Sequence, residues 1–452
     1  VAVHDADPDA VSAPAVVARR VGGGEEGTAV LATQAQVGSV HGLAWDPGRG
    51  AVYAAAHHRR GLPFGPGGPG AIYRIDVASG DVALLASLSA GPNRHGLDDD
   101  PGAPAFAGRT SLGDLDIAAD GSELYAANLF DGRIARIALP GGELADTQLH
   151  GAARERWGAD ARIFGLGVDG GWVYHGVVNS RATTPASSPI FDAMVYRARP
   201  GDRVAEQVLR FGLEYARAVP WSAWDDAADG AGRDEPLLAD IGFGPNGAPI
   251  LGLRDRRADD RPDCVWDAAC RTGSSLGDLL AAVARDTVGW RVVTSPPWYS
   301  DTDDAGVDTL WGSLATLPGQ DGVVAPGRPA RRAADGSASV ELVRFAGGSG
   351  RLLGAVGVVT ASAASALGAG DVEVLCAPGA ALPPEALATA TAEAGAAATA
   401  TAAERGNALA TQRVPTLTAH APTLEARKTV AVATATALAP TLAAAAPTRT
   451  AR

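Results

Sequence analysis

Three aspartates, Asp114, Asp240 and Asp371, stand directly before an aliphatic residue in three similar short stretches of the chain. If these stretches are equivalent strands around one axis, their carboxylates converge on an axial channel. Converging carboxylates supply the oxygen ligands that Ca²⁺ prefers. The pattern therefore predicts an axial metal site, and with it a metal-dependent hydrolase or lactonase as one possible function. The alternative is that each aspartate caps a turn or accepts hydrogen bonds from neighbouring backbone amides.

Other polar clusters are less informative. The segment His57–Arg60 reads His-His-Arg-Arg, and neighbouring side chains of a strand point to opposite faces, so the two histidines make a poor metal pair. We expect this segment and the Gly/Pro-rich loop Gly61–Gly70 to form a contact surface. Asp98–Asp100 and Asp301–Asp304 lack the spacing of an EF-hand loop and are expected to be solvated.

Three cysteines are present, Cys264, Cys270 and Cys376. Cys264 and Cys270 lie six positions apart in a polar stretch, without the second pair or the histidines that a zinc site requires. We predict that they form a small disulfide loop in an oxidising compartment. Cys376 follows an apolar strand pattern and is expected to be a buried thiol.

A short pattern, a small residue or glycine leading into an aliphatic strand, recurs six times. The occurrences are His41–Asp46, Leu112–Ile117, Phe164–Asp169, Leu238–Phe243, Trp311–Thr316 and Gly370–Val374. Several are followed by a turn, often Asp-Gly or Asn-Gly, which are typical of hairpins, and then by a second strand. A third and a fourth strand are clearest at Ala71–Asp76 and Asp81–Leu85.

A four-stranded unit that recurs around a ring predicts an all-β fold, a roughly six-bladed β-propeller. A β-sandwich is the alternative, but it lacks this long-period repeat. The last repeat is too short for a complete blade, so we expect Pro14–Gln34 to supply the missing strands and close the ring. All Trp, Tyr and Phe residues precede position 346. The predicted domains are an N-terminal arm, 1–13, the propeller, 14–379, and a low-complexity Ala/Thr/Pro-rich tail, 380–452.

The composition restricts the partners and the location. A net charge of −13 argues against nucleic acid, which requires a basic face. No apolar run reaches the roughly 20 residues of a membrane helix, so no membrane insertion is expected. Because the sequence opens with Val1 rather than Met, we expect an exported protein whose leader has been removed.

The motifs of the propeller region are similar to those of a known group of proteins. The stretches that resemble bacterial extracellular propeller-like proteins are His41–Asp76, Ser111–Asp116, Asn128–Asp131, Leu238–Ile241 through Leu253–Arg256, and Gly370–Cys376. In many of these, the propeller precedes B-type immunoglobulin-like modules of the serine-aspartate-repeat kind. The resemblance covers roughly residues 28–379. It implies an extracellular or cell-surface location rather than a particular reaction, and this chain has the Ala/Thr/Pro tail in place of those modules.

The tail offers two interpretations. Pro-Thr-Leu occurs three times, at Pro415, Pro422 and Pro440, and the stretch between the last two alternates in a strand-like way. The tail is either a disordered, O-glycosylated stalk or a segment that adds to a partner subunit as a strand. In the second case the assembly residues are Thr429, Val430, Val432 and Leu438 together with the three prolines.

No nucleophile elbow, Walker loop or dinucleotide fingerprint in its strand–turn–helix context is present. We therefore predict a non-catalytic structural or interaction protein of an extracellular filament or cell surface, assembled as a homo-oligomer through the tail and the arm. The metal-dependent propeller hydrolase with Ca²⁺ is the first alternative. The second is a carbohydrate-binding adhesin that recognises surface glycans through loop aromatics, Trp221, Trp224, Trp298 and Tyr299. By position these lie in exposed loops, where they could stack on sugars or equally pack down over a blade.

Overall fold

The computed structural model divides the chain into two compact units, Val1–Ala398 and Thr399–Arg452. It describes residues 1–5, 13–19, 28–93, 102–183, 190–217, 219–226, 233–260, 276–285, 289–294, 299, 308–317, 320–328, 338–361 and 367–375. Every described residue belongs to the first unit. The three cysteines, and therefore the predicted disulfide, lie outside the described residues, as do the predicted assembly residues of the tail.

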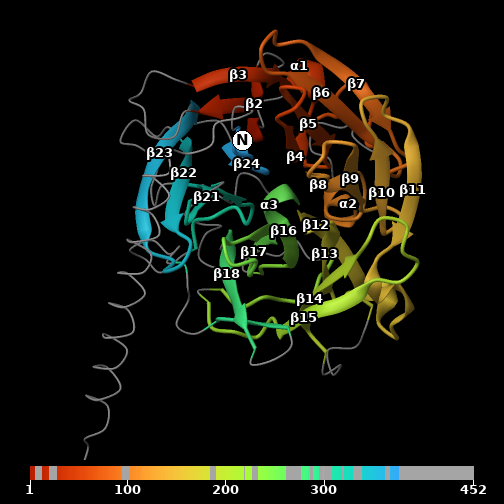
Figure 1. Cartoon of the computed structure of the whole chain (residues 1–452), viewed down its shortest axis with the longest axis vertical. Coiled ribbons are helices and arrows are strands. Elements are labelled where there is room, and N and C mark those ends of the chain that lie inside the picture. Colours follow the sequence, from red (N-terminus) through yellow and green to blue (C-terminus); the bar gives the residue numbers. More distant parts are fainter. Residues whose placement is uncertain are drawn as a thin grey trace, which may run out of the picture. The chain divides into compact units, whose positions relative to one another are not determined.

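Five four-stranded antiparallel sheets surround a common axis and make the first unit a β-propeller (Figure 1). The first sheet contains β4 (Val40–Asp46), β5 (Ala51–Ala56), β6 (Ala71–Asp76) and β7 (Val82–Ser87). The second contains β8 (Leu112–Ile117), β9 (Glu123–Asn128), β10 (Arg133–Ala138) and β11 (Leu144–Leu149). The third contains β12 (Ala161–Asp169), β13 (Trp172–Asn179), β14 (Asp192–Ala198) and β15 (Glu206–Gly212). The fourth contains β16 (Pro236–Phe243), β17 (Pro249–Asp255), β18 (Gly277–Ala284) and β19 (Trp290–Val292). The fifth contains β20 (Ala315–Thr316), β21 (Gly322–Gly327), β22 (Ala338–Ala346) and β23 (Leu352–Ala361).

Burial decreases from the axis outward, and the sequence of each strand follows it. Every residue of β5 is buried, whereas the outer strand β7 has none that is. Small and aliphatic residues therefore fill both faces of the inner strands, which pack against neighbouring blades. The expected inner, second and third strands are confirmed in the five sheets, whereas the sixth expected inner strand, Gly370–Val374, lies outside the strands. Hairpin turns use glycines with positive φ, such as Gly121 at 68°, a conformation that costs glycine little.

Glycines at the heads of inner strands allow neighbouring backbones to approach closely. A Cβ on Gly42 of β4 would lie 2.5 Å from the carbonyl oxygen of Gly113 on β8. A Cβ on Gly165 of β12 would lie 2.5 Å from the amide nitrogen of Asp240 on β16. These contacts are shorter than any real side chain makes, so crowding at the axis requires glycine at both positions.

The chain ends of the first unit meet in two further pairs of strands, β1 (Val3–Asp5) with β24 (Leu367–Ala369) and β2 (Pro14–Arg19) with β3 (Thr28–Thr33). A bridge between Ala2 and Val16 links the two pairs. Val17 N donates to Val1 O over 3.0 Å, and Ala2 N donates to Asp371 O over 2.9 Å. The first residues of the predicted arm therefore pair with strands of the propeller.

The helices among the described residues are short. They are α1 (Gln34–Val37), α2 (Ala103–Phe106), α3 (Arg257–Asp260) and two 3-10 turns, η1 (Gly151–Arg154) and η2 (Gly158–Asp160). Figure 1 shows α3 at the centre of the ring. Among the described residues, no helix has the length and apolar character needed to cross a membrane.

Candidate functional site

The ends of the inner strands enclose an acidic cavity on the propeller axis. Its volume is about 1020 Å³, and it is lined by residues of β4, β8, β12, β16 and β20 and by the segment from Asp371 to Val374. Eight of the lining residues are carboxylic acids: Asp46, Asp114, Asp116, Asp120, Asp169, Asp240, Asp371 and Glu373. Arg49 is the single basic residue among those that line it. The site therefore has a strongly negative character.

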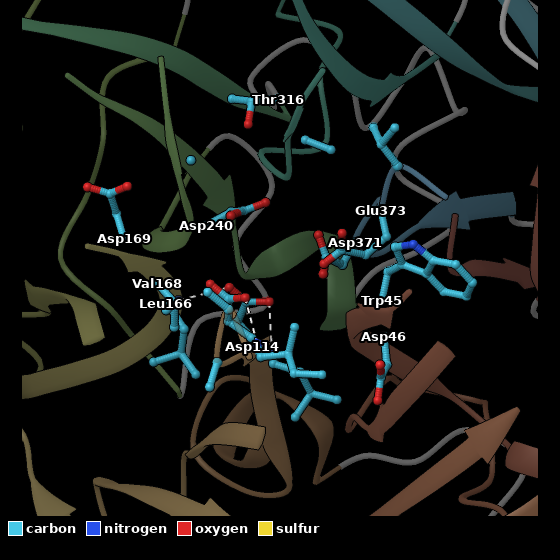
Figure 2. Close-up of a pocket in the computed structure, with 18 of the residues that line it drawn as sticks. Trp45, Asp46, Asp114, Leu166, Val168, Asp169, Asp240, Thr316, Asp371 and Glu373 are labelled. Carbon is cyan, nitrogen blue, oxygen red and sulfur yellow. Dashed lines mark hydrogen bonds between the residues drawn. The ribbon is translucent and has the colours of Figure 1, made fainter. Parts of the chain in front are cut away.

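The three predicted site residues do come together here. Asp114, Asp240 and Asp371 face the cavity from different sides of the axis (Figure 2). All three are at least nine-tenths buried, with exposed fractions of 2%, 7% and 3%. The sequence therefore predicted correctly that these carboxylates converge on the axis.

Each of these aspartates accepts a hydrogen bond from the next inner strand. Asp114 Oδ2 accepts the backbone N–H of Leu166 over 2.8 Å. Asp240 Oδ2 accepts that of Leu314 over 2.7 Å, and Asp371 Oδ2 accepts that of Leu43 over 2.8 Å. The second carboxylate oxygen of Asp114 and of Asp371 accepts the N–H of the following residue, over 2.9 and 2.7 Å. The carboxylates of Asp114 and Asp240 thus each join two neighbouring blades, and that of Asp371 joins its segment to β4. Such contacts are the structural alternative that the sequence left open.

Burial and mutual repulsion raise the pKa values of this set. Loss of solvation raises the pKa of Asp114 and of Asp240 well above the usual range, and the Asp371 carboxylate raises both further. Burial also raises the pKa of Asp371, to about 6, against the lowering effect of the Leu43 and Val372 amides. Protons are therefore held at the axis at pH values where an exposed aspartate is ionised.

Two further acids lie beside this set, and the sequence analysis missed them. Asp116 follows Asp114 by two positions, so it lies on the same face of β8, and Glu373, two positions after Asp371, lines the same cavity. Burial raises the pKa of Asp116 to about 7 and that of Glu373 well above its usual range. The Asp-x-Asp and Asp-x-Glu spacing is the signal that could have found them.

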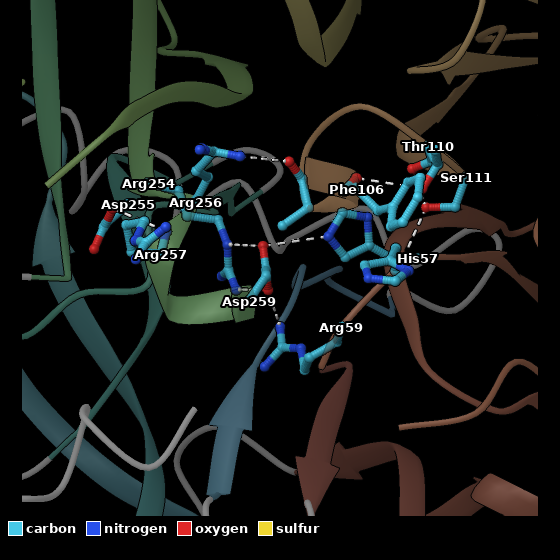
Figure 3. Close-up of polar contacts among 12 residues, drawn as sticks. His57, Arg59, Phe106, Thr110, Ser111, Arg254, Asp255, Arg256, Arg257 and Asp259 are labelled. Atoms are coloured by element: carbon cyan, nitrogen blue, oxygen red, sulfur yellow. Dashed lines mark hydrogen bonds and ion pairs between the residues drawn. The ribbon is translucent and has the colours of Figure 1, made fainter. Parts of the chain in front are cut away.

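The opposite end of the axis is closed by a buried ionic cluster around α3. Asp259 Oδ1 lies 2.8 Å from Arg59 Nη2 and 2.5 Å from Arg254 Nη2. Its Oδ2 lies 3.3 Å from His57 Nε2 (Figure 3). The Arg254 guanidinium also donates to the Trp311 and Ala369 carbonyl oxygens, over 3.3 and 3.0 Å. These contacts join α3 to three blades and to β24.

This cluster corrects the interpretation of His57–Arg60 as a contact surface. His57, His58 and Arg59 are at most 1% exposed. The ring of His57 packs against His41 and Phe164, with centroids 5.2 and 5.4 Å away. The segment is buried because it follows β5 directly into the axis, where Asp259 compensates its charge.

The loop aromatics are also buried rather than exposed. Trp224 lies under the Arg256 guanidinium at 4.3 Å, and its indole N–H donates to the Pro236 carbonyl oxygen over 3.0 Å. Trp221 lies 3.6 Å from the Arg217 guanidinium carbon, and Tyr299 packs against Phe345. These rings stack on cations and neighbouring blades, so of the two interpretations that the sequence left open the structure shows packing over a blade. Trp298 lies outside the described residues.

Metal binding by the axial carboxylates stays a prediction. In the described part of the chain, no group of three or more His, Cys, Asp or Glu side chains has the arrangement of a metal site. The donor chemistry of the cavity suits a hard cation such as Ca²⁺, since every candidate ligand there is a carboxylate or carbonyl oxygen. However, Asp114, Asp240 and Asp371 would have to share their oxygens between a cation and the strand amides.

Fold and site together define an all-β propeller with an acidic axial cavity that is closed at one end by α3. No protein-family model matches the chain. It is 25% identical to colossin-D of Dictyostelium discoideum over 295 residues, which are 60% of this chain and 31% of that protein. Over 256 residues it is 25% identical to colossin-C of the same organism, covering 51% of this chain and 25% of that protein. The chain therefore spans less than a third of the length of these relatives.

Solved structures with a similar course of the chain have low sequence identity to it. The periplasmic gluconolactonase PpgL of Pseudomonas aeruginosa is 15% identical, with a TM-score of 0.39 over 77% of this chain and 95% of that chain. A chain of a nidogen/laminin complex is 9% identical, with a TM-score of 0.38 over 74% of this chain and 84% of that chain. At such values the propeller assignment rests on the sheets of this chain itself. The comparisons add no support for a bacterial origin or for serine-aspartate-repeat modules, so that part of the resemblance stays a prediction.

Proposed function

We propose that this chain is a non-catalytic structural or interaction protein of an extracellular filament or cell surface, and that its arm and its Ala/Thr/Pro tail join one subunit to the next. The axial aspartates favour a scaffold role because each is engaged by a neighbouring strand. The observation that carries the proposal lies at the rim of the propeller, where apolar side chains are exposed on outer strands.

These rim side chains are unusual for strand edges. Eight large hydrophobic side chains are exposed among the described residues, and six of them lie on outer strands: Val30 (β3), Leu84 (β7), Leu144 and Leu149 (β11), Leu352 and Leu353 (β23). An outer strand presents free backbone amides and carbonyls, and proteins usually protect such edges with charge or proline. Apolar outer strands instead favour the addition of a further strand from a partner. The alternating tail segment from Thr429 to Leu438 has the pattern of such a strand.

Closure of the ring is part of the same proposal. We infer that β24, β1, β2 and β3 act together as a sixth blade, in which strands from both ends of the propeller pair. The bridge from Ala2 to Val16 and the hydrogen bond from Ala2 N to Asp371 O support it. A blade of mixed origin stabilises a ring because it removes the exposed inner edges.

Sedimentation velocity of rim variants tests the proposal. The double variant Leu352→Lys/Leu353→Lys of the full chain should lower the mass of the assembled species, because charge on β23 opposes strand addition. Val204→Lys is the matched control, since Val204 is 69% exposed but lies outside the strands. If all three proteins sediment as the same monomer at high concentration, the proposed assembly does not occur.

A metal-dependent hydrolase or lactonase is the second candidate, and the acidic cavity of about 1020 Å³ is the observation that favours it. Asp114, Asp240 and Asp371 would be its metal ligands and Ca²⁺ its cation. Calorimetric titration of the full chain with Ca²⁺ tests this. Binding that is lost in Asp240→Asn would support the candidate, and no heat at millimolar Ca²⁺ would argue against it.

A further inference from the structure

A buried ionic group at the closed end of the axis has two guanidinium groups and one carboxylate, those of Arg59, Arg254 and Asp259. Asp259 is the carboxylate that both Arg59 and Arg254 contact, and all three side chains are at most 1% exposed. Both ring nitrogens of His57 face acceptors, the Leu112 carbonyl oxygen at 2.8 Å and Asp259 Oδ2 at 3.3 Å. Two buried guanidinium groups thus share the single Asp259 carboxylate. The cluster therefore has an excess of buried positive charge.

Hydrogen-bond donors at this end lack acceptors. Among the described residues, Nε and Nη1 of Arg59 have no hydrogen-bond partner, although the side chain is 1% exposed. A guanidinium is a planar fork of five N–H donors, and only the Nη2 side of this one faces the carboxylate. Burial lowers the pKa of the Arg59 guanidinium to about 9, and Asp259 opposes this effect in part.

His41 is a second buried side chain with unused hydrogen-bonding capacity. It is 0% exposed, and neither of its ring nitrogens has a hydrogen-bond partner in the described part of the chain. Its ring lies 5.2 Å from that of His57, measured between centroids. Burial and the nearby Arg254 charge lower the pKa of His41 well below its usual value, so the ring is neutral and can donate one N–H.

We propose that the closed end of the axis binds a small monovalent inorganic anion, of the halide class, against the free edge of Arg59. Two observations define the ligand. Excess buried positive charge together with free N–H donors requires an anion that accepts several hydrogen bonds. The near-complete burial of Arg59, His57 and Asp259 leaves no approach for a large organic carboxylate or a peptide. The anion would complete the charge balance of the cluster that joins α3 to the surrounding blades.

Thermal unfolding of the full chain at constant ionic strength tests the proposal, with chloride replaced stepwise by isethionate, an anion too large for the site. Chloride should raise the unfolding midpoint by a few degrees in a saturable way, because a ligand bound only to the folded state stabilises it. This increment should vanish in Arg59→Gln. It should persist in the matched control Arg60→Gln, since the neighbouring Arg60 has a 32% exposed side chain and lies 3.8 Å from Asp260.

A crystallographic experiment keeps the proposal testable if Arg59→Gln does not fold. Crystals of the full chain grown in bromide should show an anomalous peak within hydrogen-bonding distance of Arg59 Nε or Nη1. Water density at this position in saturating bromide, or a midpoint with the same chloride dependence in Arg59→Gln as in the parent, would overturn the proposal.

Discussion

The carboxylate of Asp114 on β8 accepts the backbone N–H of Leu166 on β12 over 2.8 Å, across the interface of two blades. The same contact recurs between Asp240 and Leu314 and between Asp371 and Leu43. It follows that these carboxylates hold neighbouring parts of the ring together, while a close glycine contact, that of Gly42 with Gly113, lies between β4 and β8.

This relationship predicts different effects for two substitutions of Asp114. Asp114→Ala removes the acceptor of the Leu166 amide and should lower the free energy of unfolding by about 1–3 kcal/mol. Asp114→Asn removes a charge that burial disfavours and keeps one acceptor oxygen, but its NH2 group leaves one of the Leu115 and Leu166 amides without an acceptor. Its loss of stability should therefore be smaller than that of Asp114→Ala. Urea unfolding measures both. Equal losses in the two variants would show that the negative charge, rather than the hydrogen bond, is what the site requires.

Much of this site could be predicted from the sequence, because similar stretches that recur along a propeller sequence occupy equivalent places around its axis. Five of the six similar stretches contain the inner strands of the five sheets. The shared place of Asp114, Asp240 and Asp371 in three of the six predicted that their carboxylates converge. The partners of these carboxylates could not be predicted, since the Leu43, Leu166 and Leu314 amides look like those of any strand. His57–Arg60 was misplaced because its partner, Asp259, lies 200 residues away in sequence, and no local pattern signals such a pair.

Stability should depend on pH through Asp116. Its pKa is about 7 in the folded protein against 3.8 for an ordinary aspartate, so the folded state retains a proton that the unfolded chain releases. The stability it contributes is fully present below pH 4 and is lost as the pH rises to about 7. Asp116→Asn should therefore become more stable than the parent over this range, by about 1 kcal/mol or more at pH 8.

The measurement for Asp116 is urea unfolding of parent and variant at several pH values between 4 and 8. Asp169→Asn is the matched control, because Asp169 lines the same cavity but is exposed. A constant difference between Asp116→Asn and the parent at all pH values would contradict the raised pKa of this carboxyl group.

Asp259 should be among the most sensitive positions of the chain. Asp259→Asn leaves the buried guanidinium groups of Arg59 and Arg254 without a counter-charge, and breaking a buried ion pair in this way typically costs about 3–5 kcal/mol. Glu206→Gln, in the exposed pair of Arg197 with Glu206, should cost less than about 1 kcal/mol. Chemical denaturation compares the two. Similar small losses would mean that the cluster around α3 contributes little to the closure of the axis.

Gly42 should not tolerate a side chain. Gly42→Ala places a Cβ 2.5 Å from the Gly113 carbonyl oxygen, which should force two inner strands apart and lower stability by about 1–3 kcal/mol. Gly357→Ala is the control, because a Cβ there meets nothing within 4 Å and the residue is exposed on β23. Thermal unfolding of both variants gives the comparison, and a Gly42→Ala protein as stable as the control would show that the axis has room to relax.

Negative-stain electron microscopy of the full chain and of a variant ending at residue 379 tests the proposed assembly most directly. We predict filaments or other ordered oligomers of the full chain that disappear on truncation, while single rings remain. Monodisperse single rings from both proteins at high concentration would contradict the assembly role of the tail.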